Sequence, residues 1–159
     1  MKISSVCELQ KIAKKIKQKI NIGDSILLYG EIGVGKTTFT RLLINHISQT
    51  NRKIEVLSPT FNIVIEYFVN KINIRHFDLY RLKKVQDINN IGLFENINQS
   101  LTIIEWPEIL EKENLSRYVS IKILETKKLN EYRDVEVAFF GDGWDDLVGA
   151  LLGSKHFNK

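Results

Sequence analysis

The stretch of sequence that decides the fold is Gly30-Glu31-Ile32-Gly33-Val34-Gly35-Lys36-Thr37. It matches the pattern G-x-x-x-x-G-K-[ST], a glycine-rich loop whose backbone N–H groups surround the phosphate groups of a nucleotide. Residues 26–29 before it form a short apolar run typical of a buried strand, and residues 38–47 after it carry apolar side chains near helical spacing. This order of strand, loop and helix predicts a phosphate-binding loop rather than a glycine-rich turn beside an ordinary lysine.

The residue types in this loop suit a nucleoside triphosphate and its metal ion. Glycines let the backbone turn tightly and approach oxygen atoms closely, and the N-terminus of the following helix offers unpaired N–H groups and partial positive charge. The lysine of the motif, Lys36, can reach the β- and γ-phosphates, and the hydroxyl of Thr37 can bind Mg²⁺. The predicted cofactors are therefore a nucleoside triphosphate and Mg²⁺. The loop residues predicted to bind the triphosphate are Gly33, Val34, Gly35, Lys36, Thr37 and Thr38.

The composition predicts one soluble globular domain, residues 1–159, in which 43% of the residues are hydrophobic. No apolar run approaches the ~20 residues that span a bilayer, the first residues lack the apolar core of a signal peptide, and the lone Cys7 cannot form an internal disulfide. We therefore expect a cytoplasmic protein without membrane contact. The net charge of +4 permits a polyanionic partner, but the lysines within residues 14–19 are interpreted as a solvated helix face.

Hydrophobic periodicity and turn residues assign the remaining elements. Residues 62–69 and 71–77 are two β-rich runs separated by a single residue, and they are predicted to form an antiparallel hairpin. Further strands are predicted at 54–57, 101–104, 119–124 and 135–140, and helices at 8–20, within 81–90, at 107–112 and after Gly143. No internal repeat, low-complexity tract or linker divides the chain, which agrees with a single domain.

An acidic residue follows the apolar strand predicted at 101–104. Hydrolysis of a bound nucleotide needs a carboxylate that holds the metal ion, and in such folds this group sits at the end of a neighbouring apolar strand. Glu105 meets that description. Because Glu is one methylene longer than the more usual Asp, it can reach the metal directly or through a water molecule. We favour this role over that of an ordinary carboxylate at a strand end.

A second acidic candidate lies in the segment that follows the predicted hairpin. If the chain stays extended from His76 to Tyr80, the period of two places His76, Asp78 and Tyr80 on one face. Two interpretations of Asp78 remain open: it polarises the attacking water or holds a metal-bound water, or it pairs with Arg81 or caps a turn. His76 is interpreted as a hydrogen-bonded structural histidine rather than a base.

Thr60 is the third candidate, on the loop between the helix of the phosphate loop and the hairpin. Its position resembles that of the switch threonines that sense a γ-phosphate. By composition alone an ordinary threonine of a turn is an equal alternative. No cluster of His and Cys suggests zinc, and no Ser-His-Asp arrangement is visible in the sequence.

Four motifs, in one order and spacing, resemble the signature of the TsaE family. They are Gly30-Glu31-Ile32-Gly33-Val34-Gly35-Lys36-Thr37-Thr38-Phe39, Ser58-Pro59-Thr60-Phe61, His76-Phe77-Asp78-Leu79-Tyr80-Arg81-Leu82 and Ile104-Glu105-Trp106-Pro107-Glu108. The similarity extends from about Gly23 to Glu108, whereas residues 113–159 match only in general pattern. Members of this family are small bacterial ATPases required for the threonylcarbamoyl modification of adenosine 37 in tRNA.

This resemblance implies an α/β fold of the P-loop NTPase type, with three layers, a mostly parallel central sheet and an antiparallel hairpin. It implies weak ATP hydrolysis, with Thr37 and Glu105 around Mg²⁺ and Asp78 important for turnover. The catalytic residues are then Lys36, Asp78 and Glu105, and the ATP-binding set includes Thr60 and Trp106. For Trp106, packing in the core is the alternative.

The resemblance also implies a partner. The protein would act on a heterodimer of two related proteins, one of which transfers the threonylcarbamoyl group to tRNA. ATP binding and hydrolysis would reset that complex between rounds, and tRNA would be reached only through it.

Two other functions remain as alternatives. Many P-loop proteins of this size are small-molecule kinases, but these usually carry an arginine-bearing lid and an acceptor pocket. Here the basic segment at 127–133 is short and mixed with acidic residues. The other alternative is a binding module that responds to nucleotides without useful catalysis. Turnover separates the three, because an ATPase releases phosphate with its partner, a kinase needs an acceptor metabolite, and a binding module does neither.

Overall fold

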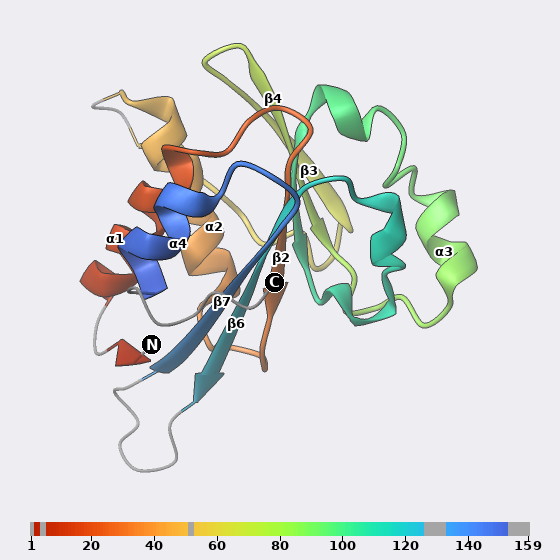
Figure 1. Cartoon of the computed structure of the whole chain (residues 1–159). Coiled ribbons are helices and arrows are strands. Elements are labelled where there is room, and N and C mark those ends of the chain that lie inside the picture. Colours follow the sequence, from red (N-terminus) through yellow and green to blue (C-terminus); the bar gives the residue numbers. More distant parts are fainter. Residues whose placement is uncertain (1, 4–5, 51–52, 126–132, 153–159) are drawn as a thin grey trace.

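The computed structural model describes residues 2–3, 6–50, 53–125 and 133–152, and these contain one seven-stranded sheet (Figure 1). The strands are β1 (Lys2–Ile3), β2 (Ser25–Tyr29), β3 (Val64–Val69), β4 (Ile72–Asp78), β5 (Leu101–Glu105), β6 (Tyr118–Glu125) and β7 (Arg133–Phe140). The α-helices are α1 (Val6–Lys17), α2 (Lys36–Ser48), α3 (Val85–Asn90) and α4 (Asp145–Leu152). Three 3-10 helices span Ile97–Gln99, Pro107–Ile109 and Lys112–Asn114. Residues 127–132 of the basic segment lie outside the described residues.

The order of strands in the sheet is β1-β7-β6-β2-β5-β4-β3. Strands β6, β2, β5 and β4 run parallel at the centre, and β3 pairs with β4 in an antiparallel hairpin. These pairings confirm the predicted α/β fold with a parallel centre and an antiparallel hairpin. At the other edge β7 pairs antiparallel with β6, and β1 with β7. Strand β1 was not predicted, because two residues are too few to show a period.

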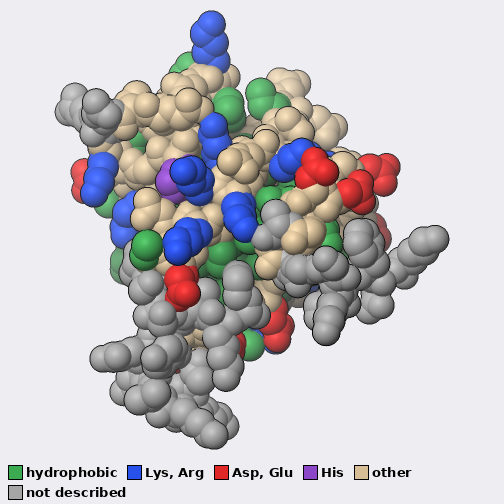
Figure 2. Space-filling view, turned by 60° about the vertical axis from the view of Figure 1, so that its left-hand side comes forward, with side chains coloured by type: hydrophobic (Ala, Val, Ile, Leu, Met, Phe, Trp, Pro, Cys, Tyr) green, Lys and Arg blue, Asp and Glu red, His purple; other side chains and the backbone are tan. Residues whose placement is uncertain are grey.

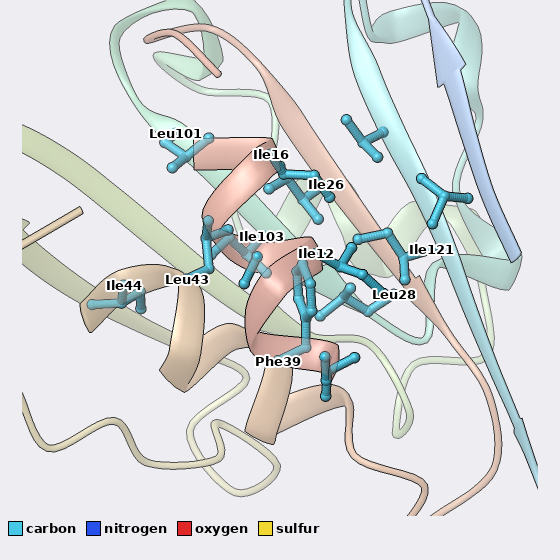
Figure 3. Packing of buried hydrophobic residues seen from close by; sticks show 14 of the residues in the cluster. Ile12, Ile16, Ile26, Leu28, Phe39, Leu43, Ile44, Leu101, Ile103 and Ile121 are labelled. Carbon is cyan, nitrogen blue, oxygen red and sulfur yellow. The ribbon is translucent and has the colours of Figure 1, made fainter. Parts of the chain in front are cut away.

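Helices lie on both faces of the sheet, which gives the predicted three layers (Figure 1). Successive residues of β2 point to opposite faces: Ile26 and Leu28 pack under α1 and α2, whereas Leu27 joins the core cluster beside α3. Figure 3 shows Phe39 of α2 among the side chains of α1, β2 and β5. Burial on both faces explains why β2 reads as a continuous apolar run instead of an alternating one.

Helix α1 packs its apolar side chains on the sheet and turns lysines toward solvent. Ile12 and Ile16 are buried, and Lys11 and Lys14 are exposed. Figure 2 shows Lys and Arg side chains gathered over this face of the molecule. The arrangement agrees with a solvated helix face. None of the helices in the described part of the chain is long and apolar enough to cross a bilayer.

The prediction of a strand at 54–57 is wrong. This segment has no strand partner, because side chains satisfy its backbone instead. The amide of Asn45 on α2 exchanges two hydrogen bonds with the backbone of Ile54, at 2.8 and 3.1 Å. Arg41 donates to the carbonyl of Val56 at 3.1 Å, and the N–H of Leu57 donates to the hydroxyl of Tyr67 at 3.2 Å. The segment therefore lies along α2 without joining the sheet.

The prediction of one continuous helix at 107–112 is also wrong. Pro107 starts a 3-10 helix that ends at Ile109, and Leu110 is extended, with φ −80° and ψ 129°. The side chain of Leu110 is buried in the core cluster beside α3. Pro107 thus keeps its preferred place at the start of a helix, but the helix ends where Leu110 turns into the core.

Gly30, directly after β2, lets the chain pass close to β6. A Cβ atom built at this position would lie 2.2 Å from the carbonyl oxygen of Ile123, and φ is +133°, which L side chains rarely adopt. At Gly33 and Gly35 of the same loop, nothing lies within 4 Å of such a Cβ. The first glycine of the motif is thus needed for packing, and the other two leave open space.

We expect Gly30→Ala to lower the free energy of unfolding by ~2 kcal/mol or more, because the new methyl group meets backbone in a strained conformation. Urea unfolding followed by circular dichroism measures this. Gly149→Ala in α4 is the matched control, since its Cβ meets nothing within 4 Å. Alanine there should be neutral or stabilising by up to ~1 kcal/mol. Wild-type stability of Gly30→Ala would contradict the close approach to β6.

Candidate nucleotide-binding site

A cavity of about 270 Å³ opens at the carboxyl ends of the central parallel strands. Parallel pairing brings these ends together: Leu28 of β2 pairs with Glu105 of β5, and Asp78 of β4 pairs with the same Glu105. The loop after β2 and the start of α2 close one side of the cavity. All the site residues predicted from the sequence line it except Val34.

Val34 differs because its side chain points into the core, where it is 5% exposed. Its N–H donates to the carbonyl of Glu31 at 3.5 Å, a long bond within the loop. Gly33 and Gly35 on either side have φ of +81° and +118°. The loop is thus anchored by one buried side chain between two glycines that line the cavity.

Lys36 is held inside the loop by carbonyl oxygens. Its ammonium donates to the carbonyls of Gly30 at 2.6 Å and Glu31 at 2.9 Å. The same nitrogen lies 3.9 Å from the centre of the Trp106 ring, a cation–π contact. Burial lowers the pKa of Lys36, and the nearby carboxylates of Glu105 and Asp78 oppose that shift.

The hydroxyl of Thr37 and the carboxylate of Glu105 lie side by side at the cavity. The hydroxyl of Thr37 donates to Oε2 of Glu105 at 3.2 Å, and Glu105 is only 3% exposed. Neighbouring ligands of an octahedral Mg²⁺ with bonds of ~2.1 Å lie about 3 Å apart, so the two oxygens fit one metal shell. The described residues contain no group of three or more His, Cys, Asp or Glu that could hold a metal ion. A hydroxyl and one carboxylate instead suit Mg²⁺ completed by phosphate and water.

Asp78 is oriented by a loop and a turn. Thr60 donates its hydroxyl hydrogen to Oδ2 of Asp78 at 2.7 Å, and the N–H of Tyr80 donates to Oδ1 at 2.9 Å. Strand β4 ends at Asp78, so Tyr80 lies in the following turn and not on a strand face with His76. Asp78 is buried beside the cavity, where a carboxylate with two fixed donors keeps one orientation.

Trp106 lies between the cavity and the core. Its backbone has φ +58°, its ring is 4.8 Å from the ring of Tyr80, and it also packs against the core cluster beside α3. The packing interpretation of Trp106 is confirmed, and binding of ATP by Trp106 stays a prediction. The cavity lining also includes Ile32, Ser58 and Tyr80, which were not predicted as site residues. Ser58 could have been predicted from the sequence, because it lies in the same motif as Thr60. In the structure the hydroxyls of these two residues are 2.8 Å apart.

The arrangement of sheet, loop and helix is that of the P-loop NTPase fold. The crystal structure of YdiB from Bacillus subtilis has the same fold, with a TM-score of 0.67 and 25% identity, over 99% of this chain and 95% of YdiB. Among sequences, the family profile described as "Threonylcarbamoyl adenosine biosynthesis protein TsaE" matches residues 3–135. The chain belongs to the TsaE family, as its four motifs predict.

Individual relatives agree with this assignment, and each carries the name tRNA threonylcarbamoyladenosine biosynthesis protein TsaE. The protein of Rickettsia felis is 41% identical over 65% of this chain, and the match spans 60% of that protein's length. The protein of Rickettsia prowazekii is 38% identical over 79% of this chain and 88% of its own length. The protein of Bacillus subtilis is 29% identical over 95% of this chain and 90% of its own length.

We expect Lys36→Ala and Thr37→Ala each to weaken the binding of ATP with Mg²⁺ by about 10- to 100-fold or to abolish turnover. Each removes a contact to a charged phosphate or to the metal ion. Isothermal titration calorimetry and phosphate release measure the two effects. Lys11→Ala, an exposed lysine on α1, is the matched control. Wild-type binding and hydrolysis in both loop variants would refute the assignment of the site.

Proposed function

We propose that the protein is a Mg²⁺-dependent ATPase that serves the threonylcarbamoyl modification of adenosine 37 in tRNA. Hydrolysis is weak in the isolated protein and is stimulated by a partner. The observation that carries this proposal is the convergence of Lys36, Thr37, Asp78 and Glu105 on one cavity beside a glycine-rich loop. Membership of the TsaE family supplies the biological setting.

The loop residues bind the triphosphate. Open space at Gly33 and Gly35 lets phosphate oxygens approach the backbone N–H groups at the start of α2. Lys36 exchanges the carbonyls of Gly30 and Glu31 for phosphate oxygens, a stronger charge-assisted interaction. Thr37 and Glu105 hold Mg²⁺, which neutralises the charge that develops on the phosphates during hydrolysis.

Asp78 orients the water that attacks the γ-phosphate. Its two hydrogen bonds to Thr60 and to the N–H of Tyr80 fix the carboxylate, and further lone pairs remain for a water molecule. Asp78 pairs with Glu105 in the register of the sheet, so it lies close to the proposed metal ligand. The hydrogen bonds that orient the two carboxylates come from different residues. This division gives the two acids separate roles, one for metal and one for water.

The partner is the heterodimer whose subunits transfer the threonylcarbamoyl group, and tRNA is reached through that complex. Exposed apolar side chains at the cavity support a protein partner: Ile32 and Tyr80 line it and are 71% and 50% exposed, and Phe61, next to the lining residue Thr60, is 87% exposed. Phe61 follows Thr60, which bonds to Asp78. A partner seated on Phe61 would thus act one residue away from the donor that orients Asp78, which offers a route to stimulation.

Phosphate release tests the proposal most directly, with ATP and Mg²⁺, and with and without the heterodimer and tRNA. We expect slow release from the protein alone and faster release with the heterodimer. Formation of ADP and a phosphorylated metabolite, without release of inorganic phosphate, when a small acceptor metabolite is added would favour a kinase. Binding of ATP without release under any of these conditions would favour a nucleotide-dependent binding module. Either result would overturn the proposal.

Asp78→Ala should leave the dissociation constant of ATP within about 3-fold of wild type and lower kcat by about 100-fold, because the variant loses the group that orients water. Asp78→Asn has the same shape as Asp78 and keeps one acceptor oxygen for the N–H of Tyr80, while its NH2 group faces the Thr60 hydroxyl, which can also accept; it serves as the isosteric comparison. Calorimetry gives the affinity, and phosphate release gives kcat. Equal loss of binding and turnover would make Asp78 a structural residue.

Phe61→Ser should leave basal hydrolysis unchanged, since Phe61 does not line the cavity, and should remove most of the stimulation by the heterodimer. Loss of one exposed aromatic anchor typically weakens an interface by about 10-fold or more. The matched control is Phe68→Ser on β3, which is 78% exposed and lies outside the cavity lining. Equal stimulation of Phe61→Ser and Phe68→Ser across a titration of the heterodimer would place the partner elsewhere.

A further inference from the structure

His76 is a polar side chain in an otherwise apolar layer. It lies on β4 between Ile74 and Asp78 on the face that packs under α2, and it is 0% exposed. Ile74 is a member of the main core cluster. An apolar side chain at position 76 would extend that cluster. A buried imidazole at this position costs free energy unless a hydrogen-bond partner offsets the loss of water.

That partner is Glu105. Nε2 of His76 lies 2.8 Å from Oε1 of Glu105, and neither side chain is more than 3% exposed. An ionised carboxylate only accepts hydrogen bonds, so Nε2 carries the hydrogen in this pair. Nδ1 of His76 has no hydrogen-bond partner among the described residues. The imidazole makes its single polar contact with Glu105.

The two oxygens of Glu105 are therefore divided between two tasks. Oε1 is held by His76 in the core, and Oε2 is turned toward the hydroxyl of Thr37 in the cavity. Rotation of the carboxylate would break the bond to His76 in a place that water does not reach, so the orientation of Oε2 is fixed in advance. Asp78, in contrast, is oriented by Thr60 from a surface loop.

We propose that His76 is a positioning residue for Mg²⁺: it holds Glu105 so that Oε2 faces the metal position beside Thr37. This inference rests on the proposed function, because Glu105 is a metal ligand only if the cavity binds ATP with Mg²⁺. His76 touches neither nucleotide nor metal and acts through Glu105. Hydrogen bonds behind the ligands typically change metal affinity by about 10- to 100-fold.

Three substitutions separate positioning from simple packing. His76→Phe keeps a planar ring and removes the donor. His76→Gln places an amide N–H near the position of Nε2, and His76→Asn carries a donor that is too short to reach Glu105. Binding of a fluorescent ATP analogue is measured across a Mg²⁺ titration and again in EDTA, and thermal unfolding checks that each variant folds.

We expect His76→Phe and His76→Asn to need about 10-fold more Mg²⁺ for half-maximal tightening of nucleotide binding. In EDTA, the affinity of these two variants for the nucleotide analogue should stay within about 2-fold of wild type. His76→Gln should recover most of the tightening of nucleotide binding by Mg²⁺. If His76→Phe does not fold, the comparison of His76→Gln with His76→Asn decides the result in the same way.

Two results would overturn the role of His76. One is an unchanged Mg²⁺ response in His76→Asn, and the other is a parallel loss of affinity in EDTA and in Mg²⁺ in all variants, which would show a structural role. A wild-type protein that does not bind the nucleotide in Mg²⁺ is a different outcome, since it overturns the proposed function itself.

Discussion

Parallel pairing of β2, β4 and β5 is the constraint on which the site depends. The register sets Glu105 opposite both Leu28, two residues before the phosphate loop, and Asp78 at the end of β4. Residues far apart in the chain thus meet at one edge of the sheet, as expected where parallel strands end together. Helix α2, which follows the loop, begins at this edge and brings Lys36 and Thr37 to the cavity. A shift of one residue in either pairing would turn an acid away from the cavity.

Different parts of the structure orient the two acids of the site. Glu105 is fixed from the core through His76, whereas Asp78 is fixed from a surface loop through Thr60. In the proposed function Glu105 would hold the metal ion and Asp78 would orient the water, so a partner that contacts the loop at Thr60 would act on Asp78 and leave Glu105 in place. The exposed ring of Phe61 directly follows Thr60, which donates to Asp78.

Most of the fold was predictable because its elements carry local signals. The loop motif, the amphipathic α1 and the hairpin are visible in consecutive residues. The false strand at 54–57 arose because its backbone is satisfied by Asn45, Arg41 and Tyr67, side-chain partners that no periodicity reveals. The contact of His76 with Glu105 joins residues 29 positions apart. This contact depends on how β4 pairs with β5, and no local pattern in the sequence reveals that register.

A crystal structure with a non-hydrolysable ATP analogue and Mg²⁺ tests the central claim most directly. The account predicts that Nζ of Lys36 leaves the carbonyls of Gly30 and Glu31 for phosphate oxygens. It also predicts that Thr37 and Oε2 of Glu105 lie in the shell of the metal ion, with Oε1 still bonded to His76. A nucleotide seated elsewhere, or a metal ion bound without either Thr37 or Glu105, would contradict it.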